Sequence, residues 1–280
     1  MESLQTKHQR VLSSLREFER AIVAFSGGVD STLLAKLARD VLGRERALAV
    51  TADSPSLARE DLDAAVRTAR QLDLQHLVVR TAEVNNPAYQ ANPRDRCYFC
   101  KQELFDVLGA LARERGVAVV LYGAIGDDRH DDRPGEQAAR ERGIRGPLQE
   151  AGLEKWEVRE LSRALGLPNW DLPQNACLSS RVPHGQEVTV EKLRQVEAAE
   201  GFLRAQGFRQ VRVRHDGHHA RIEVGSEEVG RFSDAQLCVA VAQQFEQLGF
   251  VTVGVDRRGY RAGGADIAAD EVPLDAICKC

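Results

Sequence analysis

The segment Ala21–Ser31 constrains the fold of this chain more than any other, because a strand, a glycine pair and a helix start follow one another there. The apolar run Ala21–Phe25 predicts a buried strand, and apolar residues recur at helical spacing over Leu33–Leu42. Gly27 and Gly28 lack a Cβ, so successive backbone N–H groups can turn toward one anion beside a helix N-terminus. The segment therefore predicts a phosphate-binding strand–turn–helix unit.

The polar groups around the glycine pair indicate what kind of phosphate compound binds. Ser26 and Ser31 add hydroxyl donors, whereas the carboxylate of Asp30 repels a bare phosphate. A carboxylate is expected there if it holds a magnesium ion or a substrate donor, so Asp30 predicts a metal–nucleotide complex. An ordinary βα turn is an alternative. A hydrolase nucleophile elbow is disfavoured, because too few residues precede Ser26 to build the sheet strands that such an elbow needs.

The loop fits neither the Walker motif nor the dinucleotide-binding motif. Its sequence Ser-Gly-Gly-Val-Asp-Ser resembles the S-G-G-x-D-S signature of the PP-loop ATP pyrophosphatases, which transfer AMP to a substrate oxygen and release pyrophosphate. The resemblance implies that the loop binds ATP and Mg2+ through Ser26, Gly27, Gly28, Asp30 and Ser31. It also implies a catalytic role for Asp30.

After the loop, strands and helices alternate as far as Tyr122. The predicted strands are Ala47–Thr51, His76–Val79 and Val117–Tyr122, and the predicted helices are Ala58–Leu72 and Lys101–Arg115. This alternation predicts an α/β fold with a doubly wound parallel sheet, whose carboxyl edge holds the ATP loop. From Val188 a second alternation of helices and strands predicts a smaller α+β domain. We expect a PP-loop domain over 1–185, a substrate or oligomerisation domain over 186–258 and a loosely ordered tail over 259–280.

Composition and charge limit the partners. Charged residues make up 29% of the chain, and no apolar run approaches the ~20 residues of a membrane span, so we expect a cytoplasmic protein without a membrane partner. The net charge of −4 disfavours a protein that mainly grips a long nucleic acid. Six cysteines in such a chain are interpreted as metal ligands or catalytic groups before disulfides.

Three cysteines are candidates for one shared centre. Cys97 and Cys100 form a C-x-x-C pair, predicted in the loop before a helix, and Cys177 lies in a stretch rich in Gly and Pro. This set suits an iron–sulfur cluster with one open iron, or a zinc ion with an open position. A redox dithiol and two unrelated buried cysteines are alternatives.

Five segments sharpen the resemblance. They are the PP-loop, Arg96–Lys101, Asp127-Asp128 with Arg133–Gly135, Ala176–Arg181 and Val211–Arg214. Together they resemble the pyridinium-3,5-biscarboxylic acid mononucleotide sulfurtransferases of nickel-pincer (lactate racemase) cofactor biosynthesis, over about residues 15 to 255. In that family ATP adenylates a pyridinium carboxylate, and a sulfur nucleophile displaces AMP to give a thiocarboxylate.

The resemblance implies two routes for the sulfur. Some members sacrifice the sulfur of a single cysteine at the position of Cys177, and others hold a 4Fe-4S cluster on three cysteines. With Cys97, Cys100 and Cys177 all present, this chain resembles the cluster type, with Cys177 as a catalytic residue. The sacrificial route is the alternative. The resemblance also implies sulfide or another sulfur donor as a partner, and a homo-oligomer, either a trimer or a hexamer.

Five residues are candidates for the phosphate of the mononucleotide substrate. Arg212 and Arg214 alternate on a predicted strand and so point the same way, toward one phosphate or else toward solvent. Ser180 and Arg181 lie beside the proposed sulfur centre, and Lys101 adds charge. The alternatives are ordinary loop polarity and, for Lys101, an exposed residue at a helix start.

Four acidic residues have weaker assignments. By resemblance only, Glu200 and Glu223 correspond to positions near substrate or metal, whereas Glu on a helix or strand is usually solvated. Asp127 and Asp128 follow a strand end and are candidates to support magnesium, with a polar loop as the alternative.

The other cysteines are interpreted apart from the centre. Cys238 lies in an apolar helical context and is expected to be a small buried hydrophobe. Cys278 and Cys280 have three possible interpretations: a fourth ligand, a sulfur relay or part of a tail. We favour the tail.

Three other functions compete with the sulfurtransferase. A tRNA thiolase uses the same adenylation logic, but the acidic net charge and the lack of an obvious RNA-binding module count against it. A nitrogen ligase related to the ammonia-dependent amide synthetases would make the cysteines incidental. An iron–sulfur or zinc storage module would turn over no ATP.

Overall fold

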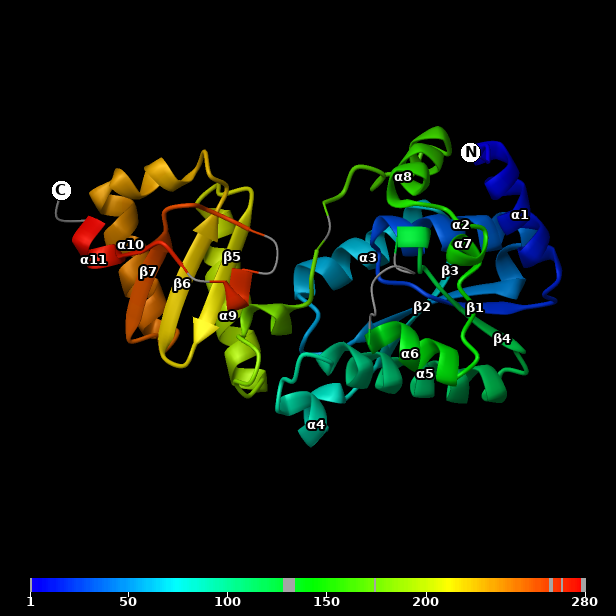
Figure 1. Cartoon of the computed structure of the whole chain (residues 1–280), viewed down its shortest axis with the longest axis horizontal. Coiled ribbons are helices and arrows are strands. Elements are labelled where there is room, and N and C mark those ends of the chain that lie inside the picture. Colours follow the sequence, from blue (N-terminus) through cyan, green and yellow to red (C-terminus); the bar gives the residue numbers. More distant parts are fainter. Residues whose placement is uncertain (1, 128–133, 174, 262–263, 268, 278–280) are drawn as a thin grey trace. The chain divides into compact units, whose positions relative to one another are not determined.

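The computed structural model describes residues 2–127, 134–173, 175–261, 264–267 and 269–277 (Figure 1). The chain divides into two compact units. Unit 1 is Met1–Asn86 with Asp95–Asn175, and unit 2 is Pro87–Arg94 with Ala176–Cys280. In these described ranges no helix has the length and apolar character needed to cross a membrane.

Unit 1 is built on a parallel sheet of four strands in the order β3-β2-β1-β4. The strands are β1 (Ala21–Ala24), β2 (Ala47–Asp53), β3 (Gln75–Arg80) and β4 (Val119–Tyr122). The helices of this unit are α1 (Leu4–Arg16), α2 (Val29–Leu42), α3 (Arg59–Gln71), α5 (Arg96–Glu114), α6 (Pro134–Glu141), α7 (Pro147–Glu150) and α8 (Lys155–Ala164). The chain moves outward from β1 through β2 to β3 and then crosses back to β4, on the other side of β1. The helices α1 and α2 cover one face of the sheet, and α5 and α6 cover the other (Figure 1). The predicted α/β fold with a parallel sheet is confirmed.

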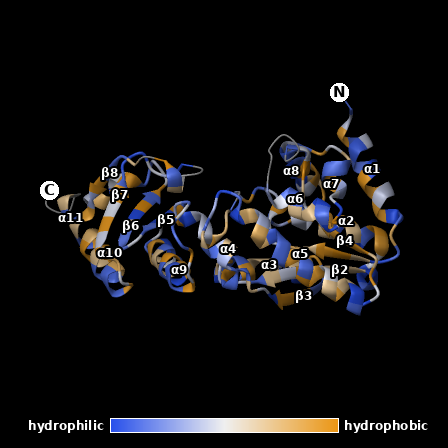
Figure 2. Ribbon diagram, turned by 60° about the horizontal axis from the view of Figure 1, so that its bottom comes forward, coloured by the Kyte–Doolittle hydropathy of each residue, from blue (hydrophilic) through white to orange (hydrophobic). Residues whose placement is uncertain are grey.

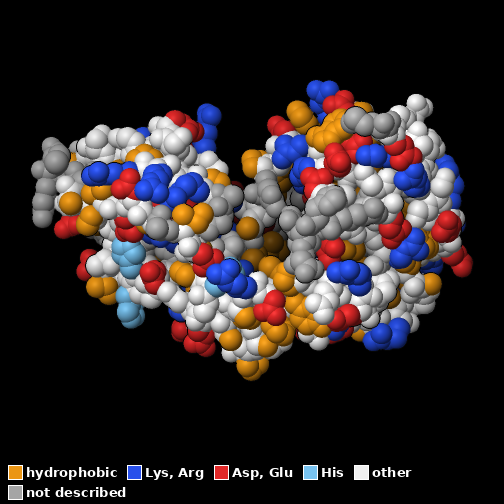
Figure 3. All heavy atoms as spheres, viewed as in Figure 1, with side chains coloured by type: hydrophobic (Ala, Val, Ile, Leu, Met, Phe, Trp, Pro, Cys, Tyr) orange, Lys and Arg blue, Asp and Glu red, His pale blue; other side chains and the backbone are white. Residues whose placement is uncertain are grey.

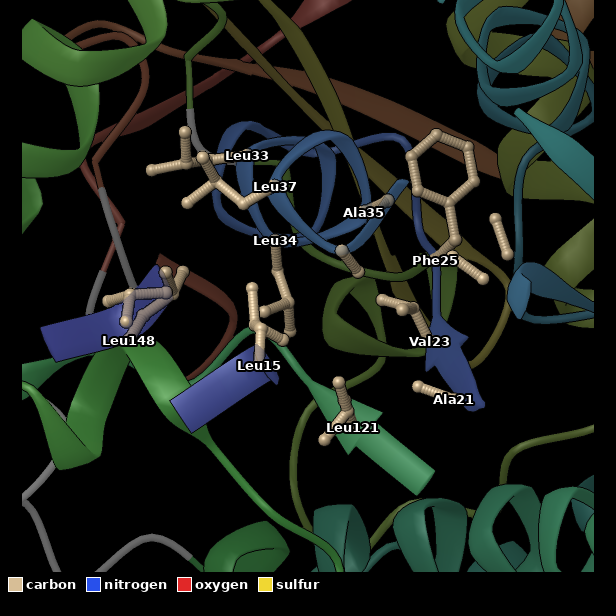
Figure 4. Close-up of a cluster of buried hydrophobic side chains, with 14 of the residues drawn as sticks. Leu15, Ala21, Val23, Phe25, Leu33, Leu34, Ala35, Leu37, Leu121 and Leu148 are labelled. Carbon is tan, nitrogen blue, oxygen red and sulfur yellow. The ribbon is translucent and has the colours of Figure 1, made fainter. Parts of the chain in front are cut away.

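Successive residues of the strands pack against opposite layers. On one face, Val23 and Leu121 pack in a cluster with Leu34 of α2 (Figure 4). On the other face, Ile22 and Phe105 of α5 belong to a second cluster. Because both faces of the sheet are covered, β1 and β4 are apolar along their whole length, and orange dominates β4 in Figure 2. The edge strand β3 is only partly buried and carries Gln75, His76 and Arg80. Full burial of a side chain such as Phe105 contributes about 1.5–3 kcal/mol to folding.

Unit 2 is the smaller α+β part. Its sheet has the order β5-β6-β7-β8, in which β6 and β7 are parallel and the other neighbours are antiparallel. The strands are β5 (Val211–Asp216), β6 (His219–Val224), β7 (Thr252–Asp256) and β8 (Glu271–Pro273), and the helices are α4 (Pro87–Gln90), α9 (Val190–Ala205), α10 (Ala235–Gln247) and α11 (Leu274–Ile277). Val213 and Ile222 pack with Phe245 of α10 in one core. Cys238 is fully buried there, as predicted, and its thiol donates to the Phe232 carbonyl.

The C-terminal region differs from the expectation. Val255 of β7 pairs with Val272 of β8, and Leu274 is buried in the core of unit 2. The prediction of a loosely ordered tail is therefore wrong for this part, because a short strand without sequence periodicity completes the sheet. Cys278 and Cys280 lie outside the described residues.

The boundary between the units falls at 175/176 rather than at the predicted 185/186, and 87–94 joins unit 2. The side-chain amide of Asn92 donates to the carbonyls of Val182 (3.3 Å) and Pro183 (2.7 Å). The hydroxyl of Tyr89 lies 2.5 Å from Ser179 Oγ, and both side chains are buried. These bonds hold the residues that follow Cys177 against the segment 87–94 of the same unit. This explains why the boundary between the two units precedes Cys177.

Candidate active site

The glycine turn joins β1 to the first turn of α2, as predicted. Gly27 has a φ of +76°, and a Cβ on it would lie 2.8 Å from the Ala65 Cβ, so both backbone angle and space require glycine. The hydroxyls of Ser26 and Ser31 are 3.0 Å apart, and the Ser26 amide donates to Ser31 Oγ at 3.2 Å. The two serines thus fix the shape of the turn, and Ser31 Oγ also donates to the Gly28 carbonyl.

A cavity of about 540 Å3 opens beside this turn. Its polar lining includes Ser26, Asp30, Ser31, Lys101, Asp127, Glu136 and Lys155. Val50, Leu57 and Leu104 contribute apolar walls. The cavity lies at the carboxyl end of β1 beside β4, where the strand order reverses and where open α/β sheets bind ligands. Its size is within the range of small-molecule sites.

Two residues that sequence reasoning missed support the turn. The side-chain amide of Asn169 donates to the Gly27 carbonyl at 2.7 Å and to Thr32 Oγ1 at 3.0 Å. Gly123 follows β4, and a Cβ on it would lie only 2.8 Å from the amide nitrogen of Ser31. Glycine at 123 therefore lets the end of β4 approach the start of α2. A glycine that directly follows a buried strand was a usable signal for this role.

Lys155 is the third residue that the sequence analysis missed. Its Nζ lies 2.7 Å and 2.8 Å from the two carboxylate oxygens of Asp30. Lys155 is the first residue of α8, where the helix dipole disfavours a cation. A lysine at a helix start was therefore the available signal that Lys155 has a special role. The sequence did not show its partner, because Asp30 lies 125 positions away.

The C-x-x-C pair lies within the first five residues of α5, so its predicted place in a loop before the helix is wrong. The helix begins earlier because Tyr98 is held there, with its hydroxyl donating to Glu141 of α6 at 2.6 Å. Helical spacing of three places Cys97 and Cys100 on neighbouring positions of one face. Cys97 is exposed and lines the cavity together with Lys101, whereas Cys100 is half-buried.

Cys177 lies in unit 2, with an exposed side chain on a firmly bonded backbone. It directly precedes the short 3-10 helix η4 (Leu178–Arg181). The guanidinium of Arg181 donates through Nη1 to the carbonyls of Ala176 (2.6 Å) and Cys177 (3.0 Å). Its Nε and Nη2 bind the two carboxylate oxygens of Glu200 at 2.8 Å and 3.1 Å. Arg181 is 1% exposed, so this side chain braces the cysteine loop from within the protein.

Glu200 is ionised in spite of its burial. Burial alone raises the pKa of this carboxyl, but the hydrogen bonds and charge of Arg181, with the Val213 amide, outweigh burial and leave the pKa below its usual value. Arg204 adds a further bond to Glu200 Oε2 at 2.9 Å. The alternative of a solvated glutamate is therefore wrong.

The arginines predicted for the substrate phosphate lie on β5. Arg214 binds Glu223 through Nη2 at 2.7 Å and donates to the Ser180 carbonyl at 3.1 Å. Glu223 is fully buried, so it too is not solvated. The Arg212 guanidinium lies 5.3 Å from the centre of the Tyr260 ring, and burial together with the neighbouring arginines lowers its pKa. These side chains are packed into the unit, against the alternative of a solvated strand face.

The structure thus gathers the predicted residues in two groups. Unit 1 brings the phosphate turn, Lys101 and Cys97 to one cavity, and Asp127 lines the same cavity. Unit 2 brings together Ser180, Arg181, Glu200, Arg214 and Glu223 with the backbone of Cys177. Within the described part of the chain, no three His, Cys, Asp or Glu side chains form a group that suits a metal ion. Asp128 lies outside the described residues.

Comparison with known proteins identifies the family. Residues 5–124 match the NAD synthase family. The chain is 38% identical over 263 residues to the pyridinium-3,5-bisthiocarboxylic acid mononucleotide synthase of Lactiplantibacillus plantarum, which covers 94% of this chain and 95% of that protein. The chain belongs to this synthase family. The resemblance stated from the motifs is confirmed.

Other relatives show how far the likeness extends. An uncharacterized protein of Synechocystis sp. is 48% identical over 260 residues, 93% of this chain and 97% of that protein, so the likeness to it covers both units. The NH(3)-dependent NAD(+) synthetase of Fusobacterium nucleatum is 30% identical over 122 residues, which are 40% of this chain and 43% of that enzyme. The bisthiocarboxylic acid synthase likeness therefore spans nearly the whole chain, and the NAD(+) synthetase likeness less than half of it.

Proposed function

We propose that this chain is an ATP-dependent sulfurtransferase that adenylates a carboxylate of a pyridinium biscarboxylic acid mononucleotide and converts it to a thiocarboxylate. The observation that carries the proposal is that one cavity is lined both by the phosphate turn with Asp30 and by Cys97. The proposal also draws on the Lactiplantibacillus plantarum relative, whose name describes a bisthiocarboxylic acid mononucleotide synthase.

The first step joins the carboxylate to AMP. A substrate carboxylate oxygen attacks the α-phosphorus of ATP, and the bond to the bridging oxygen breaks with its electron pair leaving on pyrophosphate. The turn residues Ser26 and Gly28 hold phosphate oxygens, and the apolar walls formed by Val50 and Leu104 suit the adenine ring. Asp30 and Asp127 supply carboxylate oxygens of the kind that Mg2+ prefers, and the ion, when bound, neutralises phosphate charge.

The second step exchanges oxygen for sulfur. Adenylation turns a carboxylate oxygen into part of a good leaving group, so a sulfur nucleophile attacks the carbonyl carbon and AMP departs with that oxygen. We propose that Cys97, Cys100 and Cys177 hold a 4Fe-4S cluster that supplies this sulfur when bound. Thiolates are the usual ligands of such clusters, and Cys97 and Cys177 are both exposed. Sacrifice of the Cys177 sulfur is the competing route.

The substrate phosphate is proposed to bind through Arg212, Arg214, Ser180 and Lys101. Glu223 holds the Arg214 guanidinium in place. Arg181 and Glu200 bond each other, and Arg181 also donates to the backbone carbonyl of Cys177. We therefore assign these two residues to positioning of the backbone at Cys177. Lys, Arg, Asp and Glu side chains are interspersed over the visible face of unit 1 (Figure 3), which favours a small-molecule partner. The cytoplasmic location and the trimeric or hexameric assembly stay predictions.

The test is carboxylate-dependent AMP formation. Wild-type protein with MgATP and the pyridinium biscarboxylic acid mononucleotide is expected to release AMP and pyrophosphate, and Asp30→Ala and Ser26→Ala are expected to release neither while circular dichroism stays unchanged. Asp63→Ala and Ser13→Ala, exposed on α3 and α1, are matched controls that keep activity. Normal AMP formation by Asp30→Ala would remove the assignment of the loop.

A further inference from the structure

The ion pair between Asp30 and Lys155 occupies the carboxylate that the proposed function gives to magnesium. One ammonium lies within 2.8 Å of both Asp30 oxygens, and the two side chains are 31% and 27% exposed, for lysine and aspartate respectively. Both residues line the cavity beside the phosphate turn. A metal ion that binds Asp30 must therefore displace the ammonium or share the carboxylate with it.

The backbone of Lys155 is fixed while its side chain reaches into the cavity. Glu154 and Glu157 form a reciprocal capping box at the start of α8. Glu157 is buried and also accepts a hydrogen bond from Lys7 of α1 at 2.7 Å. The Lys155 amide donates to Asp127 Oδ1 at 3.4 Å. A lysine has four rotatable side-chain bonds, so its ammonium can change partners without any movement of this anchored helix end.

We propose that Lys155 exchanges partners during the reaction. In the empty site it neutralises Asp30, and when a divalent cation takes that carboxylate, the ammonium moves to the phosphates of the nucleotide. There it stabilises the negative charge that develops on the departing pyrophosphate. The exchange rests on the proposed function, because the anion that receives the ammonium is the triphosphate. It makes Lys155 a catalytic residue of the adenylation step.

The exchange predicts opposite effects of one substitution on two ligands. Lys155→Met removes the competitor for Asp30, so Mn2+ alone, followed by electron paramagnetic resonance, is expected to bind about three- to fivefold more tightly. The same variant is expected to bind MgATP about tenfold more weakly and to lose at least a hundredfold in pyrophosphate release, because a charged phosphate contact is lost. Lys155→Arg keeps the charge and is expected to recover most of the MgATP affinity.

Lys101→Met is the matched control for the metal titration. Lys101 lines the same cavity, but its Nζ lies over the Phe105 ring, 5.7 Å from the ring centre. Its removal is expected to change Mn2+ affinity less than twofold. Unchanged Mn2+ affinity in Lys155→Met, or equal tightening in both variants, would overturn the exchange. The Mn2+ titration needs no nucleotide, so it tests the Asp30–Lys155 competition even if AMP formation fails.

Discussion

The bond network around Arg181 allows a stability prediction with a worked magnitude. Arg181→Met leaves the fully buried Glu200 carboxylate without two hydrogen bonds of 2.8 Å and 3.1 Å. Removing one partner of a buried pair costs about 3–5 kcal/mol in the free energy of unfolding. Arg204 and the Val213 amide still bind Glu200, so we expect the lower end, about 3 kcal/mol.

The assay must report on unit 2 by itself. Both tryptophans of the chain, Trp156 and Trp170, lie in unit 1, so their fluorescence does not follow unit 2. Hydrogen exchange of α9 peptides, read by mass spectrometry, gives the opening free energy where Glu200 lies. The double variant Arg181→Met/Glu200→Leu replaces both charges by apolar side chains and is expected to recover most of the loss. A loss below about 1 kcal/mol, or a double variant no more stable than Arg181→Met, would refute the reasoning.

The same network makes the stability of unit 2 depend on pH under acidic conditions. The folded-state pKa of Glu200 is below its ordinary value of 4.5, so the stabilisation from the ionised carboxylate is present above pH 4.5 and is lost as pH falls through the folded-state pKa. Wild-type α9 is therefore expected to lose protection below pH 4.5. In Glu200→Gln this acid-dependent component should vanish, and an unchanged pH profile in that variant would contradict the pairing.

The remaining predictions concern the site. Gly123→Ala is expected to weaken ATP binding about tenfold without unfolding the chain, because the added Cβ must push back the first turn of α2, which isothermal titration would show. Arg212→Ala should weaken binding of the mononucleotide by about 1.5–3 kcal/mol and leave ATP affinity unchanged. An equal loss of ATP affinity would contradict the assignment of Arg212 to the phosphate of the mononucleotide. Alanine at any one of the three proposed cluster cysteines should abolish both the visible cluster absorption and multiple turnover. Loss of hydrogen sulfide from Cys177, measured by intact mass with Cys97 and Cys100 dispensable, would instead support the sacrificial route.

Local sequence signals predicted the elements that position the site. The apolar run before Ser26 and the helical periodicity after Ser31 placed β1, α2 and the turn between them, because both elements are buried by their own sequence pattern. The start of α5 was misplaced although Asp95 stands at its N-cap. The Asp95 side chain makes no capping bond there, and the first turn carries a bond from Tyr98 to the distant Glu141 that the sequence does not reveal.

Long-range pairs account for most of what sequence reasoning missed. Lys155 and Asp30 are separated by 125 positions, and the packing of α8 against α2 brings them together. Glu200 and Arg181 were assigned roles at the substrate, but each finds its partner in the other inside unit 2. β8 is three residues long, too short for a period-two pattern to be recognised.

The ratio of AMP to thiocarboxylate tests whether adenylation and sulfur insertion occur on one carboxylate. Anaerobically purified protein, reconstituted with iron and sulfide, is mixed with MgATP, sulfide and the pyridinium biscarboxylic acid mononucleotide, and AMP and thiocarboxylate are quantified by mass spectrometry. We expect one AMP for each carboxylate oxygen replaced by sulfur, with no AMP when the mononucleotide is omitted. ADP as the product, or AMP formed without the mononucleotide and without any thiocarboxylate, would contradict it.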